Sequence, residues 1–172
     1  MSTFRIRNGS AADAPAVVGL FDEAVAWLVN RGQVGQWGTT PWSQRPELVA
    51  RTRVWAEAGG LRIAEEEQVA LAPLGALVLG VHPPHVEPIE ESEAYVEALV
   101  TSRAHAGRRI GAQLVAAAAD EARESGAAVL RVDCWAGAPP LVAWYERQGF
   151  VRSGRFDVRG WIGQVFEMRL AS

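Results

Sequence analysis

The sequence predicts a single domain of the α/β class, residues 1–172, in which helices cover a mixed sheet. The chain is long enough to bury one sizeable core, and 49% of its residues are hydrophobic. Segments with strand alternation and segments with helical spacing follow each other in a recognisable order. That order is strand, two helices, three strands, helix, strand, helix and two strands, which indicates a mixed α/β sandwich.

The first third of the chain is expected to form one strand and two helices. Residues 4–7 alternate between apolar and charged side chains, as in a short strand. Residues 11–29 and 46–58 carry apolar side chains at helical spacing, and each segment is followed by glycine. Between these helices, Trp37 and Trp42 lie in a loop rich in turn-forming residues. Such rings anchor a loop on the core or line a substrate site, and both interpretations stay open.

Residues 61–64 and 74–81 have the pattern of a strand pair, although the turn between them is not defined by the sequence. Residues 82–93 are rich in proline and glutamate, which predicts an exposed loop. This loop is either a solvated charged segment or an acidic lip that attracts a cationic amine. His82 and His85 could ligate a metal, but a proline-rich loop is a poor template, so we expect no metal site.

An anion-binding loop is predicted in the middle of the chain. Residues 95–101 form a short apolar run typical of a buried strand, and an amphipathic helix begins at Ile110. The glycine-bearing residues between them would leave backbone N–H groups pointing forward at the helix start. Together with Arg108 and Arg109, these groups suit a pyrophosphate. A turn with no ligand is the alternative; the sequence, which has no lysine, fits neither a Walker loop nor a Rossmann fingerprint.

The last third is expected to form a strand, a helix and a closing pair of strands. Residues 128–135 read as a strand, and Pro139 and Pro140 suit the start of a helix that continues to Gln148. Gly149 suits a left-handed helix cap. The closing strands are expected over residues 151–157 and 164–170.

Two of these blocks resemble the GNAT superfamily of N-acetyltransferases. The first is the strand, loop and helix around residues 95–122, and the second is the tyrosine-bearing helix LVAWYERQGF at residues 141–150. The resemblance covers most of the chain. It implies a mostly antiparallel central sheet flanked by about four helices, with a splay between the fourth and fifth strands. Ala106, Arg109 and Ala138 depart from the residues usual in the family.

By this resemblance the cofactor is acetyl-CoA. Backbone groups of the strand are expected to pair with the pantetheine arm, and the loop and first helical turn are expected to cradle the pyrophosphate. The cofactor-binding residues so implied are Leu99, Val100, Thr101, Ala106, Gly107, Arg108, Arg109, Ile110, Gly111 and Ala112.

The resemblance also makes Tyr145 the candidate acid for the leaving thiolate. A phenol with a pKa of about 10 protonates a thiolate with a pKa near 8.5 at a cost of about 2 kcal/mol, so a hydrogen bond to sulfur matters more than full transfer. Glu97 is our first choice of general base and Asp133 is our second. Asp133 is also expected to bind the substrate, together with Trp37 and Trp42. A solvated or ion-paired state is the alternative for each carboxylate. Cys134 is expected to be a buried thiol.

Charge and composition narrow the class of protein. A formal net charge of −3 argues against a nucleic-acid surface, and neither a membrane span nor a signal peptide is apparent. All seventeen basic residues are arginine, which we attribute to the GC-rich genome of a bacterium.

We expect a cytoplasmic N-acetyltransferase that acts directly on a primary amine of a small molecule or peptide, either as a monomer or as a homodimer. The alternative is a non-catalytic acyl-CoA-binding module of the same fold, motivated by the two changed motif positions, Ala106 and Arg109.

Overall fold

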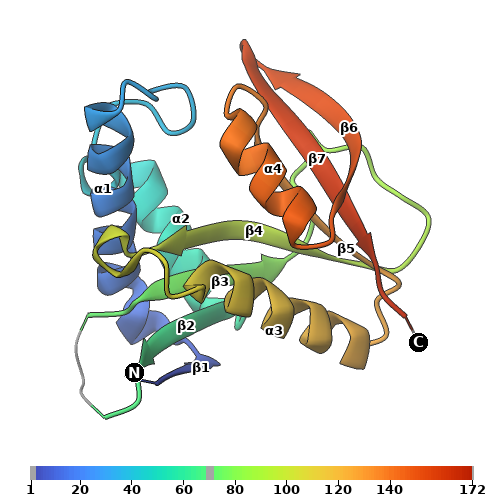
Figure 1. Cartoon of the computed structure of the whole chain (residues 1–172), viewed down its shortest axis with the longest axis horizontal. Coiled ribbons are helices and arrows are strands. Elements are labelled where there is room, and N and C mark those ends of the chain that lie inside the picture. The colour runs from blue at the N-terminus through green and yellow to red at the C-terminus, as the bar shows by residue number, and fades with distance from the viewer. Residues whose placement is uncertain (1–2, 69–71, 172) are drawn as a thin grey trace. The chain divides into compact units, whose positions relative to one another are not determined.

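A computed structural model describes residues 3–68 and 72–171, and Figure 1 shows its helices and strands. Seven strands are hydrogen-bonded in the order β1-β2-β3-β4-β5-β7-β6. The strands are β1 (Phe4–Asn8), β2 (Leu61–Glu66), β3 (Gly75–Gly80), β4 (Glu93–Thr101), β5 (Val129–Trp135), β6 (Val151–Val158) and β7 (Trp161–Arg169). The helices are α1 (Ala14–Asn30), α2 (Pro46–Glu57), α3 (Ile110–Glu124) and α4 (Pro139–Arg147). This architecture confirms the expected mixed, mostly antiparallel sheet with four helices.

By its internal contacts the chain divides into two compact units. Unit 1 comprises Met1–Val78 and Ala98–Leu114, and unit 2 comprises Leu79–Glu97 and Val115–Ser172. The elements β3, β4 and α3 each contribute residues to both units. The expected single domain stays a prediction, and each unit is described below by itself.

Unit 1 has its core on one face of its antiparallel strands. Leu61 pairs with Val78 and Ile63 with Ala76, so these four side chains share a face. Helices α1 and α2 pack against that face with a stripe of apolar side chains, as their helical spacing predicts. The α1 stripe includes Val17, Leu20, Phe21 and Ala24, and α2 contributes Leu48 and Ala56.

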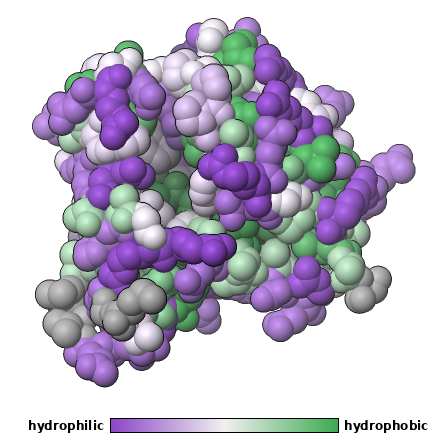
Figure 2. Space-filling model, viewed as in Figure 1, coloured by the Kyte–Doolittle hydropathy of each residue, from purple (hydrophilic) through white to green (hydrophobic). Residues whose placement is uncertain are grey.

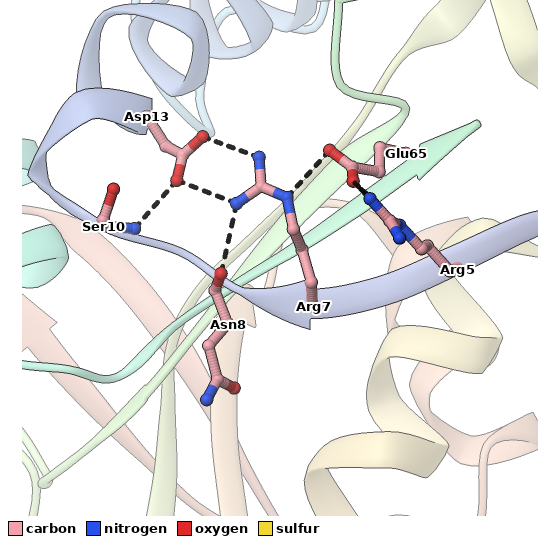
Figure 3. Close-up of polar contacts among 6 residues, drawn as sticks. All are labelled: Arg5, Arg7, Asn8, Ser10, Asp13 and Glu65. Carbon is pink, nitrogen blue, oxygen red and sulfur yellow. Dashed lines mark hydrogen bonds and ion pairs between the residues drawn. The ribbon is translucent and has the colours of Figure 1, made fainter. Parts of the chain in front are cut away.

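A network of charged side chains ties β1 to β2 and to the start of the first helix (Figure 3). The Arg7 guanidinium lies 2.8 Å from Asp13 Oδ1 and donates through Nε to Glu65 at 2.8 Å. Arg5 donates to the same Glu65 carboxylate. Asp13 also accepts from the backbone N–H of Ser10. The hydrogen bonds from Arg7 lower the pKa of Asp13 and of Glu65, so this network favours both carboxylates in their charged form.

In unit 2 the two faces of the strands carry different chemistry. Cross-strand register places Val132 of β5 beside Phe166 of β7, and the ring of Tyr145 on α4 lies 5.4 Å from Phe166. Tyr145 therefore covers the face that bears even-numbered β5 residues. Because side chains alternate along a strand, Arg131 and Asp133 point to the opposite face.

Several element boundaries differ from the sequence prediction. Residues 11–13 form a short 3-10 helix, so α1 begins at Ala14 rather than at residue 11. The strand β7 begins at Trp161, three residues earlier than expected, because the turn is tightened around Arg159 and Gly160, both with positive φ. Part of the turn between β2 and β3, residues 69–71, lies outside the described residues.

The predicted exposed loop over residues 82–93 is wrong in two respects. Glu93 is the first residue of β4, and Val86 is only 2% exposed. Val86 packs with Tyr95, Val165 and Phe156, on the face of unit 2 opposite Tyr145. The segment therefore covers an apolar face of the strands, which its proline and glutamate content conceals.

Figure 2 shows hydrophilic side chains over much of the face that it draws, with apolar residues in smaller groups between them, as is normal for a protein surface. Within residues 3–68 and 72–171, none of the helices combines the length and the apolar character that a bilayer span requires.

Candidate functional site

The candidate cofactor loop connects β4 to α3 and lies in unit 1. Leu99, Val100 and Thr101 end β4, as predicted, and a short 3-10 turn, Arg103–His105, follows. Gly107 and Arg109 then adopt left-handed backbone conformations, with φ of 87° and 59°. Glycine enters this region freely, whereas arginine enters it at a cost. Arg109, which stands where the family usually has glycine, thus keeps the backbone conformation that glycine favours.

The first turn of α3 completes the loop. The helix begins at Ile110, so Gly111 and Ala112 belong to it rather than to the loop. Backbone N–H groups in a first turn have no intrahelical acceptor, and they point out of the helix start. This arrangement suits a phosphate-bearing group, as the sequence predicted for Ala106–Ala112.

Glu23 of α1 holds the beginning of the loop. Its Oε1 accepts hydrogen bonds from the backbone N–H of Arg103 at 2.5 Å and of Ala104 at 3.3 Å. It also accepts from Ser102 Oγ at 3.2 Å. One carboxylate oxygen therefore joins the end of β4 to a helix about 80 residues earlier in the sequence. The sequence offered no signal for this contact.

The two loop arginines differ in their partners. Arg108 Nη1 donates to Glu66 Oε1 of β2 at 2.6 Å, and this hydrogen bond raises the pKa of the guanidinium. A phosphate would have to compete with Glu66 for Arg108. Arg109 is exposed, and no ion pair of its side chain occurs in the part of the chain that the structure describes. Arg109 is therefore the better placed of the two to meet an anion.

In unit 2, strands β4 and β5 diverge at the position of two carboxylate side chains. Their parallel ladder pairs residues 93–96 with residues 129–132 and then ends, which is the expected splay. Glu97 and Asp133 are the first residues beyond the ladder on β4 and β5. Alternation of side chains places both on the face opposite Val96 and Val132.

Glu97 lies over the backbone of β3. A Cβ atom at Gly80 would be 2.7 Å from Glu97 Oε2, so the absence of a side chain at Gly80 makes room for the carboxylate. Glu97 is partly buried and has further interactions. The structure thus gives the candidate base a defined place.

Asp133 is held by a phenol from the neighbouring strand. The Tyr95 hydroxyl donates to Asp133 Oδ2, and Tyr95 itself is fully buried. Burial raises the pKa of Asp133 above its usual value, while the hydrogen bond from Tyr95 and the charges of His85 and Arg131 act in the opposite direction. The pKa of Tyr95 is also raised, first by burial and then by the Asp133 charge, so the phenol stays a donor.

Tyr145 is packed among aromatic rings on the other face of unit 2. Its ring lies 5.0 Å from Trp144 and 5.8 Å from Phe150, and the residue is 5% exposed. Burial raises the pKa of Tyr145, with smaller contributions from Cys134 and Asp133, so the phenol is protonated at neutral pH. Cys134 is buried as expected, and burial raises the pKa of its thiol to about 12, which disfavours the thiolate that a nucleophile needs.

The two tryptophans predicted to line a substrate site lie in unit 1. Trp42 is 6% exposed, stacks on Phe21 with ring centroids 4.0 Å apart, and donates to Thr52 Oγ1. This packing favours the anchoring interpretation for Trp42. Trp37 contacts Phe21 edge-on at 5.3 Å and is only partly buried, so it remains the better substrate-lining candidate.

The two histidines considered as metal ligands have other surroundings. His82 Nδ1 lies 2.5 Å from Glu93 Oε1, and Glu93 also accepts from Arg131. The His85 ring packs against Phe156. Across residues 3–68 and 72–171, no three His, Cys, Asp or Glu side chains are grouped closely enough to hold a metal ion.

Comparison with known proteins defines the class as an acetyltransferase. Residues 23–150 match the Acetyltransferase (GNAT) family. The chain belongs to that family. Among curated proteins the sequence has no match.

Solved structures share the fold at low sequence identity. A GNAT-family acetyltransferase from Listeria monocytogenes is 23% identical with a TM-score of 0.73, covering 97% of this chain and 95% of its own. The yncA protein from Salmonella typhimurium, solved with its cofactor acetyl-CoA, is 19% identical with a TM-score of 0.68, covering 99% and 96%. The ribosomal-protein-alanine N-acetyltransferase from Brucella melitensis is 23% identical with a TM-score of 0.63, covering 96% and 99%.

Proposed function

We propose that this chain is an acetyl-CoA-dependent N-acetyltransferase that transfers the acetyl group directly to a primary amine of a small molecule or peptide. The observation that carries the proposal is the parting of β4 and β5. The ladder ends immediately before Glu97 and Asp133, and the predicted pantetheine-binding segment, Leu99–Thr101, continues along the same strand β4. One strand thus supplies both a candidate base and the start of the cofactor site.

The residues of the cofactor loop fit a CoA pyrophosphate. The N–H groups of the first turn of α3 and the left-handed residues Gly107 and Arg109 suit a multiply charged anion. So does the Arg109 guanidinium, which makes no ion pair within residues 3–68 and 72–171. When bound, acetyl-CoA supplies an activated acetyl thioester. Solved relatives such as yncA contain this cofactor.

Glu97 would take the proton of the acceptor amine. An alkylamine with a pKa of about 10.4 must lose a proton at a cost of about 4.6 kcal/mol at neutral pH, so a nearby base, reached directly or through water, would help. Tyr145 would donate a hydrogen bond to the leaving sulfur. Its raised pKa makes full proton transfer less favourable and keeps the hydroxyl available as a donor.

A second candidate function is a non-catalytic acyl-CoA-binding module. Two departures from the usual family residues favour it. Arg109 adopts a left-handed backbone at a cost in free energy that glycine would not have, and Ala106 replaces the usual polar side chain. Under either function, we predict that the protein is bacterial and cytoplasmic and that it is a monomer or a homodimer.

Thermal unfolding with ligands tests the cofactor, and thiol release tests the chemistry. At a hundredfold excess over the dissociation constant, acetyl-CoA or CoA should add about 2.7 kcal/mol to stability, a shift of roughly 5–11 °C, whereas ATP and NAD should not. Release of CoA thiol with a panel of primary amines then supports the enzyme. A thermal shift without release of CoA thiol in the presence of any amine would favour the binding module. No thermal shift with acetyl-CoA or CoA would exclude both candidate functions.

A further inference from the structure

Asp133 is a partly buried carboxylate without an ion-pair partner in the described ranges, residues 3–68 and 72–171. Its hydrogen bond comes from the neutral Tyr95 hydroxyl. Two cationic side chains act on Asp133 through their charge, His85 and Arg131. Arg131 is engaged elsewhere: Nη1 donates to Glu93 at 3.0 Å and Nη2 donates to the Glu87 carbonyl at 3.0 Å. Carboxylates removed from water are normally paired with a cation, so the missing partner of Asp133 points to a ligand.

The surroundings of Asp133 define the chemistry of that ligand. The face of unit 2 that carries Asp133 also carries Phe156, which packs with Tyr95 and Val86. The His85 ring lies 4.5 Å from Phe156, and the Trp161 ring stacks 5.8 Å from it. A carboxylate that shares a strand face with aromatic rings suits an ammonium group on an apolar stem, because the carboxylate neutralises the charge and the rings offer an apolar surface to the carbon chain.

We propose that Asp133, held in place by Tyr95, is the docking carboxylate for the protonated amino group of the acceptor. The substrate class is then a cationic primary alkylamine. This inference rests on the proposed function and deepens it, because it assigns different roles to the two carboxylates at the end of the β4–β5 ladder. Asp133 binds the ammonium group, and Glu97 subsequently accepts its proton.

The roles follow from how the two side chains are held. The Tyr95 hydroxyl occupies one oxygen of Asp133 and fixes its direction, as a binding group requires. Glu97 lies over Gly80, whose missing side chain leaves room for the carboxylate beside that strand. A cation bound at Asp133 would offset the desolvation of the buried carboxylate, which a neutral ligand of the same shape could not do.

Calorimetric titration of the full chain with CoA present tests the inference without turnover. The probes are benzylamine, phenethylamine and 1,4-diaminobutane, with benzyl alcohol as the neutral isostere of benzylamine. Wild-type protein should bind at least one amine and should prefer benzylamine to benzyl alcohol. Asp133→Asn should weaken amine binding about 10- to 100-fold, the size of one hydrogen bond to a charged group, and leave benzyl alcohol unchanged.

Two further variants keep the test specific. Asp120→Asn removes a carboxylate that is 71% exposed on α3 and should leave all affinities unchanged. Tyr95→Phe keeps the buried ring and removes the hydroxyl, so amine binding should weaken about three- to tenfold while Asp133 remains. No binding of any amine to wild-type protein, or equal amine affinity in wild type and Asp133→Asn, would overturn the inference.

Parallel thiol-release assays separate this inference from the proposed function. Acetylation of amines whose affinity does not depend on Asp133 overturns the inference and leaves the enzyme intact. Asp133-dependent amine binding without acetylation of any amine supports the cation site and overturns the proposed function.

Discussion

The cofactor loop presents backbone groups, whereas the parting of β4 and β5 presents side chains. On the proposed function, the loop would recognise the cofactor through the left-handed backbone at Gly107 and Arg109 and through the first turn of α3. At the end of the β4–β5 ladder, recognition of the acceptor would depend on Glu97, Asp133 and Tyr95. Backbone recognition tolerates side-chain substitution, so the changes at Ala106 and Arg109 need not remove the cofactor site. Side-chain recognition does not tolerate it, and single substitutions should separate the two regions.

The largest effect is expected for Glu97→Gln. A general base contributes roughly 10²–10⁴ in rate, so kcat/KM should fall by about that factor while the dissociation constant of CoA stays unchanged. Gly80→Ala provides a matched variant that leaves Glu97 in the chain. Its new Cβ would lie 2.7 Å from Glu97 Oε2 and displace the carboxylate, so a smaller loss is expected. If kcat/KM of Glu97→Gln equals that of the wild type in steady-state kinetics, Glu97 is not the general base.

Tyr145→Phe should have the next largest effect. The variant keeps the ring that packs on Phe150 and Phe166 and removes the hydroxyl. If the hydroxyl donates to the leaving sulfur, kcat should fall about 10- to 100-fold with an unchanged thermal shift by CoA. A variant with the wild-type rate would leave Tyr145 with a packing role alone.

Glu23→Ala should weaken cofactor binding about tenfold with little change in kcat, because the start of the loop loses its contact with α1. Glu23→Gln keeps an acceptor oxygen, so its affinity for CoA should lie between the affinities of Glu23→Ala and the wild type. Titration with CoA and steady-state kinetics measure the two quantities separately. A fall in kcat at unchanged CoA affinity would contradict a role in positioning the loop.

Arg7→Ala should change stability without changing either recognition region. Loss of the network in Figure 3 should lower the free energy of unfolding by about 1 kcal/mol at pH 7, a Tm shift of about 2–4 °C. Arg7 lowers the pKa of Asp13 and Glu65, so its stabilisation is present above their unfolded pKa values near 4 and is lost as the pH falls below them.

Thermal scans at pH 7 and pH 3 check this sign, since the difference between wild type and Arg7→Ala should shrink at pH 3. Arg123→Ala is the control, because its ion pair with Asp120 is largely exposed and should contribute under 1 kcal/mol. A difference that grows at pH 3 would contradict the network as described.

The smallest effect is expected for Arg109→Gly. Relief of the left-handed arginine roughly offsets the greater freedom of glycine in the unfolded chain, so stability should change by under about 1 kcal/mol. Arg109→Ala keeps the backbone cost and removes the charge. CoA titration of the two variants then tells whether the loop binds through its backbone: comparable small losses support that view, and a large loss in both assigns the affinity to the guanidinium.

The sequence predicted the features that depend on neighbouring residues. The strand before the loop, the start of α3 at Ile110 and the aromatic helix around Tyr145 all follow from local periodicity. Contacts between residues far apart in the chain could not be predicted from the sequence. Tyr95 and Asp133 are 38 residues apart, and Arg108 and Glu66 are 42 apart. The parallel register of β4 and β5 brings Tyr95 to Asp133, and the tertiary fold of unit 1 brings the loop residue Arg108 to Glu66.

Composition was misleading at one place. The segment before β4 has the prolines and glutamates of a solvated loop, yet Val86 is buried in a cluster with Tyr95 and Val165. A single apolar residue among polar ones carries too little periodicity to reveal this burial.

The same segment offers a route by which acceptor preference could diverge among descendants of one ancestral gene. It has no helix or strand of its own between β3 and β4, and it is fixed to unit 2 by Val86 and by the Glu87 carbonyl. It brings His85 to the face that bears Asp133. If Asp133 docks the acceptor as proposed, exchanges at His85 would alter acceptor selectivity while the strands that define the fold remain intact.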